Sequence, residues 1–420
     1  MIGRRTATAL IATTLIASAL TAPTLALAGV KPAPSTFYNA VGPTLAWWRV
    51  DTVAATVTRE GSVELPALVQ YAWRHPKRPV LYVASSNFVP MGKADGKHHL
   101  TAFHIDRASG ALTPFGSPVP IKARPIHITV DGSGGYLLAA YNIPSSMSVH
   151  ALAPDGTIGS EAKQLADVDG GIYAHQIRMF PSNKALILVT RGNNAVAGKP
   201  EDPGALKVKR LKDGQLTDVA SVAIGNGPGF GPRHVDFHPT KPWLFASVER
   251  QNQLQVWRLA GESLQAQPVH TVSTLAEPAN LRPAQMVGPI HVHPNGRFVY
   301  LGNRASGQVD VDGKKAAAGG ENTIVMFRID PVSGKPDMVQ AIGTNGFHPR
   351  TFSIDPSGRM LVVANLLALP VRNGDTIRSQ PATLSSYRIA ADGKLEHVQT
   401  HDIETNGLTQ WWSGFMLMTA

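Results

Sequence analysis

One phrase of sequence recurs six times along this chain, and it restricts the fold more than any other feature. The phrase is a short apolar strand, a turn, a second apolar strand, a variable loop and a further strand. Its turns stand at His75-Pro76, Asp131-Gly132, Phe180-Pro181, His238-Pro239, His293-Pro294 and Asp355-Pro356. A repeat of roughly 50 to 60 residues made only of strands is typical of a β-propeller, in which each repeat forms one blade.

The fourth repeat, Gly231 to Leu259, shows the strand pattern in detail. Val235 and Phe237 alternate with polar neighbours before the turn, as in a strand with one buried face. The run from Trp243 to Val248 after the turn is almost continuously apolar, which is typical of a strand buried on both faces. With 39 glycines and 32 prolines among such short runs, the pattern indicates an all-β chain with many turns.

The two ends of the chain supply the remaining strands. Six repeats cover Val69 to about His397, and strand-like stretches without a local partner stand at Thr44 to Val57 and Gly414 to Met418. Pairing the last strand with the first closes the ring and leaves no long open sheet edge. We therefore predict an all-β fold, a seven-bladed β-propeller. Six blades are the alternative if the ends only pack together.

The first 28 residues have the three parts of a signal peptide. Arg4 and Arg5 form the charged start, Leu10 to Ala22 is an apolar stretch too short to span a bilayer, and Ala26 to Ala28 is a small-residue cleavage site. The paired arginines leave general secretion and twin-arginine export both open. The expected organisation is a signal peptide at 1–28 and a single propeller domain at 29–420, in a periplasmic or secreted protein.

The net charge of the chain and its distribution indicate which classes of partner to expect. The chain has 39 Lys and Arg against 29 Asp and Glu, a formal net charge of +10, but its basic residues are dispersed and form no RNA-binding motif. An anionic small molecule fits this charge better than nucleic acid does, and a basic surface that only keeps the protein soluble explains the charge equally simply. The chain has no cysteine, and a core of this size needs no disulfide. No later segment predicts a membrane span, and we expect a monomer without a cofactor.

Counting from the turns superimposes residues of different repeats. With the Pro or Gly of each turn as zero, the residue six places earlier begins the innermost strand, and the residue ten places later ends the second strand. The earlier positions hold Gln70, Ile126, His175, Arg233, Gly288 and Arg350. The later positions hold Ser86, Asn142, Arg191, Glu249, Arg304 and Leu366. The two strands form a hairpin, so both sets lie on the same rim near the central channel.

Charged and polar residues occupy these positions in consecutive repeats, although a strand end beside an apolar interior is a costly place for an unpaired charge. The residues that we predict to form one cluster are His175, Arg233, Glu249 and Arg304, with Arg350 nearby. Long segments leave the same rim after Ser86, Arg191, Arg304 and Leu366. The segment after Arg304 runs for 18 residues without apolar periodicity, and we expect it to be a loop that shapes a binding site.

At these residues the chain resembles the seven-bladed propeller lactonases, the family that includes bacterial 6-phosphogluconolactonase and fungal carboxymuconate lactonizing enzyme. The resemblance extends over roughly Tyr71 to Met418. The segments that carry it are YAHQIRMFP (173–181), GPRHVDFHP (231–239), IHVHPNGRFVYLGNR (290–304) and HPRTFSIDPSG (348–358). It implies a lactone-opening hydrolase whose functional residues correspond to His175, Arg233, Glu249 and Arg304.

The chain departs from the family pattern at Arg191-Gly192, where an acidic residue and a glycine are common, and this puts the substrate in question. Lactone hydrolysis needs a base that activates water and a cation that stabilises the developing oxyanion. Glu249 or His175 is the candidate base, and Arg233 with Arg304 suits the carbonyl or an acidic substituent. The expected substrate-binding residues are Arg350 and Arg191.

Three interpretations of function remain. The first is an exported hydrolase of carbohydrate metabolism that opens an anionic, sugar-type lactone. The second is a non-catalytic propeller that binds a ligand or an envelope partner, and the third is a lactone-forming cycloisomerase. The site residues have a structural alternative as an ion-pair network between blades. His291 and His293 share a strand face but have no evident third ligand, so no metal site is predicted. Trp411-Trp412 is assigned to the core that closes the ring, with a sugar-stacking platform as the alternative.

Overall fold

The computed structural model describes residues 35–87, 96–374 and 376–417 of the chain. The predicted signal peptide at 1–28 and Met418 lie outside these residues. Nearly all the described regular structure is β-strand, and the described helix is the short 3-10 turn Ile224–Asn226. No helix in the described ranges is both long enough and apolar enough to cross a membrane.

Seven sheets of antiparallel strands form the blades, numbered here in chain order. Blade 1 contains β1 (Ser35–Val41), β2 (Thr44–Asp51), β3 (Thr56–Glu64) and β33 (Gln410–Leu417). Blade 2 contains β4 (Leu68–Arg74), β5 (Val80–Ser86), β6 (His98–Ile105) and β7 (Leu112–Pro120). Blade 3 contains β8 (Pro125–Val130), β9 (Tyr136–Asn142), β10 (Ser145–Leu152) and β11 (Ile158–Glu161). Blade 4 contains β12 (Ala174–Met179), β13 (Ala185–Thr190), β14 (Ala205–Lys212) and β15 (Gln215–Val222).

The other three blades come from the second half of the chain. Blade 5 contains β16 (Pro232–Phe237), β17 (Trp243–Val248), β18 (Gln253–Ala260), β19 (Ser263–Leu264) and β20 (His270–Ser273). Blade 6 contains β21 (Gln285–Val292), β22 (Phe298–Ala305), β25 (Thr323–Ile329) and β26 (Pro336–Gly343). Blade 7 contains β27 (Phe347–Ile354), β28 (Met360–Leu367), β31 (Ala382–Ile389) and β32 (Leu395–Ile403). The predicted seven-bladed β-propeller is therefore confirmed.

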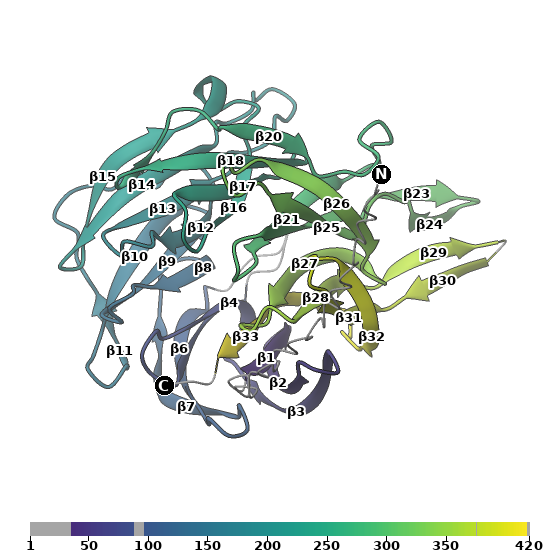
Figure 1. Cartoon of the computed structure of the whole chain (residues 1–420). Helices are drawn as coiled ribbons and strands as arrows, with labels where there is room; N and C mark the ends of the chain where they lie inside the picture. The colour runs from purple at the N-terminus through teal and green to yellow at the C-terminus, as the bar shows by residue number, and fades with distance from the viewer. Residues whose placement is uncertain (1–34, 88–95, 375, 418–420) are drawn as a thin grey trace, which may run out of the picture. The chain divides into compact units, whose positions relative to one another are not determined.

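The two ends of the chain meet in blade 1. There β33, drawn yellow in Figure 1, pairs antiparallel with β1, drawn purple. Phe415 lies opposite Phe37 with ring centroids 5.0 Å apart, and the Asn39 amide donates to the Gln410 side-chain oxygen at 3.0 Å. The partner of the last strand is thus 35–41, upstream of the stretch in which the sequence indicated a strand.

Apolar side chains fill the space between neighbouring blades. The second strand of blade 5, β17, is buried along its whole length, as its continuous apolar run predicted. Its residues pack on both sides, since Leu244 and Ala246 join a core cluster with blade 4 while Trp243 and Phe245 join one with blade 6. The burial of both faces makes each blade depend on its neighbours and holds the innermost strands in a fixed ring.

Histidines in the turns tie one blade to the next. In blade 5, His238 Nδ1 accepts from the backbone N–H of Lys241 at 2.9 Å, while its Nε2 donates to the Gly296 carbonyl of blade 6, also at 2.9 Å. Gly296 has φ +71°, and a Cβ there would lie 2.6 Å from the His238 ring. His293 makes the same link to the Gly358 carbonyl of blade 7 at 2.9 Å, while its Nδ1 accepts from the backbone N–H of Asn295. Both of its ring nitrogens are therefore occupied by structural hydrogen bonds.

Two antiparallel ribbons extend from the rim of blades 6 and 7 that carries the ends of their second strands. They are β23 (Gln308–Val311) with β24 (Lys314–Ala317), and β29 (Leu369–Asn373) with β30 (Thr376–Gln380). Figure 1 shows them side by side, and β24 contacts β29. The segment after Arg304 is therefore a hairpin rather than the irregular loop that its lack of periodicity suggested.

Candidate active site

A β-bulge marks the innermost strand of each blade at the position found by counting. In β12 the ladder passes from Ala174 to Gln176 and leaves His175 without a partner across the strand pair. Arg233 is left out in the same way in β16, and Arg350 in β27. A bulge bends its strand and aims the extra side chain away from the regular faces of the sheet. The repeat therefore brings the equivalent bulge position of each blade to the rim.

The bulge also occurs in the blades that carry other residues at this position. The residues at the remaining bulges are Gln70, Ile126, Gly288 with Pro289 and, in the closing strand β33, Trp411. Trp411 is the seventh member of the set, which the counting missed because β33 is followed by no turn of its own repeat. Assigning Trp411 to the core was wrong. Its neighbour Trp412 is 3% exposed and belongs to a core cluster, but Trp411 stacks on arginine.

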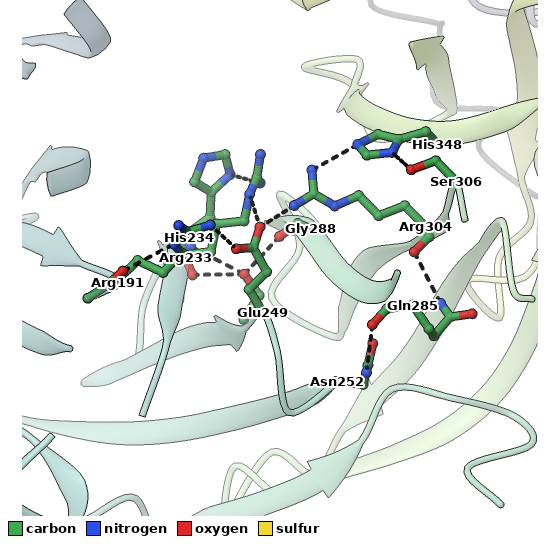
Figure 2. Close-up of polar contacts among 12 residues, drawn as sticks. Arg191, Arg233, His234, Glu249, Asn252, Gln285, Gly288, Arg304, Ser306 and His348 are labelled. Carbon is green, nitrogen blue, oxygen red and sulfur yellow. Dashed lines mark hydrogen bonds and ion pairs between the residues drawn. The ribbon is translucent and has the colours of Figure 1, made fainter. Parts of the chain in front are cut away.

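Glu249 is the centre of the predicted cluster, and three arginines hold it (Figure 2). It follows β17 and is 2% exposed. Its Oε2 lies 2.9 Å from Arg191 Nη1, its Oε1 lies 3.0 Å from Arg233 Nε, and it also pairs with Arg304 Nη2. We call these four residues the Glu249 cage. Arg233 and Glu249 come from adjacent strands of blade 5, Arg191 follows β13 of blade 4, and Arg304 lies on β22 of blade 6.

The cage keeps its carboxylate ionised and its guanidiniums in place. Burial alone would raise the pKa of Glu249, but Arg304, Arg233 and Arg191 outweigh burial and lower it to about 2. A carboxylate with so low a pKa is a weak base at neutral pH. Three positive charges around one negative charge leave the cage with an excess of positive charge. Its chemical capacity is thus to bind an anion or a developing oxyanion.

His175 is the other candidate base. It is 7% exposed, and its Nδ1 has no hydrogen-bond partner among the described residues. Burial, followed by the charges of Arg233 and Arg350, lowers the pKa of His175 well below its usual value. His175 is therefore neutral at neutral pH and has an unprotonated ring nitrogen, whereas both oxygens of Glu249 are occupied by ion pairs.

His234, which follows Arg233, supports both residues. Its ring centroid lies 5.0 Å from that of His175 in an edge-to-face arrangement, and its Nδ1 lies 3.3 Å from Arg233 Nη1. Because an arginine can only donate, Nδ1 of His234 is the acceptor. This contact fixes the direction of the Arg233 guanidinium on the side away from Glu249.

His348 is a member of the site that the sequence reasoning missed. Its Nε2 accepts from Arg304 Nη1 at 3.2 Å, and its Nδ1 lies 3.1 Å from the Ser306 hydroxyl (Figure 2). Its backbone has φ +57°, a conformation rare for a residue with a side chain and often found at functional sites. No hydrophobic period marks such a residue. The available indication was its place in the HPR segment, two residues before Arg350.

Gly288 makes room for Arg304. It occupies the bulge position of blade 6, where blades 4 and 5 have His175 and Arg233. A Cβ at Gly288 would lie 3.3 Å from Arg304 Nε and crowd the guanidinium that reaches Glu249. The absence of a side chain in this blade thus allows the arginine of the second strand to fill the position.

The two arginines expected to bind substrate occupy different surroundings. Arg191 belongs to the Glu249 cage and also lies over the Tyr173 ring at 4.1 Å. Arg350 lies outside the cage, with its guanidinium carbon 3.6 Å from the centroid of the Trp411 indole. Arg124 lies over the same indole at 5.3 Å and donates from Nε to the Gln70 side-chain oxygen at 2.8 Å.

A cavity of about 230 Å³ lies on the strands that carry these residues. Gln176, His234, Thr351 and Trp412 line it, each next in sequence to a bulge residue. The cavity therefore begins one residue further along the innermost strands than the cluster itself. Tyr71, Trp73 and Phe352 make its wall largely aromatic.

Comparisons with known proteins place the chain among lactonases. The family model described as Lactonase, 7-bladed beta-propeller matches residues 35–368. The chain is 29% identical over 276 residues to a 6-phosphogluconolactonase of Bacillus subtilis, covering 65% of this chain and 72% of that protein. It is 25% identical over 323 residues to a 6-phosphogluconolactonase of Enterobacter, covering 76% and 83%. In fold it is similar to a periplasmic gluconolactonase of Pseudomonas aeruginosa, with a TM-score of 0.69, 21% identity and coverage of 92% and 99%.

Proposed function

The chain belongs to the seven-bladed β-propeller lactonase family, and from this premise we propose that it is an exported enzyme that hydrolyses an anionic, sugar-type lactone. The observation that carries the proposal is the pairing of a neutral, buried histidine with guanidiniums that are already fixed on a carboxylate. His175 supplies the base and the Glu249 cage supplies the positive charge. A ring-opening hydrolysis needs these two elements together.

His175 is the general base of the proposed reaction. A water molecule gives a proton to the neutral imidazole as its oxygen attacks the lactone carbonyl carbon. The tetrahedral intermediate then collapses, the bond between the carbonyl carbon and the ring oxygen breaks, and His175 returns the proton to that oxygen. The product is the open hydroxy acid, which releases one proton to solvent at neutral pH.

Arg233 and Arg304 stabilise the oxyanion of that intermediate. Each guanidinium has five N–H donors, and its contacts with Glu249 and with His234 or His348 use only part of them. Because both side chains are held in place before substrate arrives, little reorganisation opposes the development of negative charge. Glu249 acts by positioning these arginines.

The excess of positive charge supports an anionic substrate. The cage has three arginines for one carboxylate, and Arg350 adds a fourth positive charge close enough to lower the pKa of His175. Placing such groups together costs free energy in the empty protein, and a negatively charged ligand offsets that cost. A substrate with a phosphate or carboxylate group fits this electrostatic field better than a neutral one.

A panel of lactones tests the enzymatic proposal. Purified protein lacking residues 1–28 is expected to release acid from sugar-type lactones, faster from those with a phosphate or carboxylate group than from neutral ones. The measurement is acid release in a pH-stat, corrected for spontaneous opening. Acid release no faster than the spontaneous rate from all members of the panel would favour the non-catalytic binding interpretation.

The export part of the proposal rests on residues 1–28. Arg4 with Arg5, the apolar stretch that follows and the Ala26 to Ala28 site support cleavage near Gly29. Amino-terminal sequencing of the protein isolated from its native cells is expected to begin near Gly29, in the fraction outside the cytoplasm. A chain that still begins with Met1 in the cytoplasmic fraction would contradict export.

A further inference from the structure

Arg350 and Trp411 form a second feature of the rim that the hydrolytic chemistry leaves unused. They occupy the bulge positions of blades 7 and 1, which are neighbours because β33 closes the ring. The guanidinium of Arg350 lies 3.6 Å from the centroid of the indole, a cation–π contact. Both side chains therefore leave their strands at the bulge position that His175 and Arg233 occupy in blades 4 and 5.

Arg350 differs from the arginines of the cage because, in the described ranges, no carboxylate forms an ion pair with it. Among the described residues, the guanidinium of Arg350 stacks on the Trp411 indole, and its Nε is buried without a hydrogen-bond partner. Burial and the charges of Arg233 and Arg304 lower the pKa of Arg350, so the protein places this cation beside others of the same sign. A cation–π contact compensates only part of such a cost, since it contributes about 0.5–2 kcal/mol.

Ring closure does not require this pair. The closing strand packs through Trp412, which is 3% exposed in a core cluster, and through Phe415 against Phe37. The side chain of Trp411 is turned out of the ladder by the bulge and lies over arginines instead. Trp411 and Arg350 thus lie at bulge positions where neither side chain contributes to the packing that closes the ring.

From these contacts we infer that Arg350, stacked on Trp411, binds the negatively charged substituent of the lactone, a role that rests on the proposed function. His175, Arg233 and Arg350 occupy equivalent bulge positions on the same rim, and the charges of both arginines act on His175. The lactone carbonyl is held at Arg233 while the anionic group pairs with the guanidinium of Arg350. Trp411 holds that guanidinium in place by stacking on its face, and Arg124 over the same indole adds positive charge.

Phosphate and carboxylate share the chemistry that this subsite recognises, so the test includes both. The probes are glucono-δ-lactone, its 6-phosphate and a glucaric acid lactone, opened by wild type and by Arg350→Gln. We expect Arg350→Gln to raise KM for the two charged lactones by roughly 10–100-fold, the loss typical of a hydrogen bond to a charged group, and to raise KM for the neutral lactone much less. The charged lactone for which wild type has the lower KM shows whether the subsite prefers phosphate or carboxylate. Equal losses for neutral and charged lactones would overturn the subsite.

Three further variants make the result specific. Arg350→Lys retains the charge and should keep part of the preference for charged lactones, while Trp411→Leu should raise their KM by roughly 3–10-fold. Arg297→Gln is the matched control, because Arg297 also stacks on an aromatic ring, Phe298 at 5.1 Å, but lies exposed in the turn between β21 and β22. It should leave all three lactones unaffected. A loss of preference in Arg297→Gln as large as in Arg350→Gln would contradict the assignment.

Binding of the ring-opened acids separates this inference from the proposed hydrolysis. Calorimetric titration should show that wild type binds 6-phosphogluconate or glucarate more tightly than gluconate and that Arg350→Gln loses the difference. This result supports the subsite even if no lactone is opened. Equal affinities of wild type for charged and neutral acids refute it even if lactones are hydrolysed.

Discussion

Replacing Glu249 with glutamine is expected to lower the free energy of unfolding by about 3–5 kcal/mol, the usual cost of removing one partner of a buried ion pair. Glutamine has nearly the same shape but no charge. It leaves Arg233 and Arg304, which are 1% and 4% exposed, as buried cations without a counter-charge. The measurement is equilibrium urea unfolding of wild type and variant at pH 7.

Glu262→Gln is the matched control for that experiment. Glu262 pairs with Arg210 at 3.0 Å, but the arginine side chain is 54% exposed, and such surface pairs contribute at most about 1 kcal/mol. Added sulfate should recover part of the stability of Glu249→Gln, since an anion can take the place of the carboxylate, and should do nothing specific for the control. Equal losses in the two variants would show that the cage is not electrostatically coupled.

The same carboxylate predicts how stability depends on pH. Its pKa is about 2 in the folded protein against 4.5 ordinarily, so its contribution is complete above about pH 4.5 and is lost as pH falls toward 2. Wild type should therefore lose its advantage over Glu249→Gln between these values. A stability difference that stays constant from pH 5 to pH 2.5 would contradict the assigned shift.

Replacing His175 with glutamine is expected to lower kcat by roughly 10²–10⁴-fold, the usual contribution of a general base. KM should change little, because the arginines that bind the lactone remain in place. His104→Gln is the matched control, since His104 stacks on Phe115 at an exposed position far along the chain from the cluster. Wild-type kcat in His175→Gln would remove His175 from the mechanism and make Glu249 the base to test next.

The pH profile gives an independent measurement of the same residue. Burial and the surrounding arginines hold the pKa of His175 below 6.5, so the base stays deprotonated well into mildly acidic conditions. The fall of kcat/KM on the acid side should therefore lie below pH 6.5 in wild type. An acid limb above pH 6.5 would mean that the titrating base is not this histidine.

The sequence predicted the fold because the repeat carries the two kinds of strand pattern and the turns that join them. Counting from the turns also brought His175, Arg233, Glu249 and Arg304 to one place, because the bulge recurs at a fixed distance before each turn. The bulge itself leaves no mark in hydrophobicity. The counting therefore located a position without showing why its side chains leave the sheet.

Other parts of the site depend on contacts that the hydrophobic pattern of the sequence does not indicate. Counting did not find Trp411, because its strand, β33, pairs with the first strand of the chain and is followed by no turn of its own repeat. His348 lies in a left-handed backbone conformation that hydrophobic patterning does not reveal. The difference between Arg191, held by Glu249, and Arg350, held by an indole, depends on which neighbour each guanidinium meets in the folded ring.

The most direct test of the whole account is a crystal structure of His175→Gln with an intact anionic lactone, which the variant should bind but open very slowly. We expect the carbonyl oxygen within hydrogen-bond distance of Arg233, the anionic group on Arg350 over Trp411, and residue 175 facing the carbonyl carbon. A lactone bound instead in the aromatic cavity beside Tyr71 and Trp73, or with its carbonyl turned away from Arg233, would contradict it.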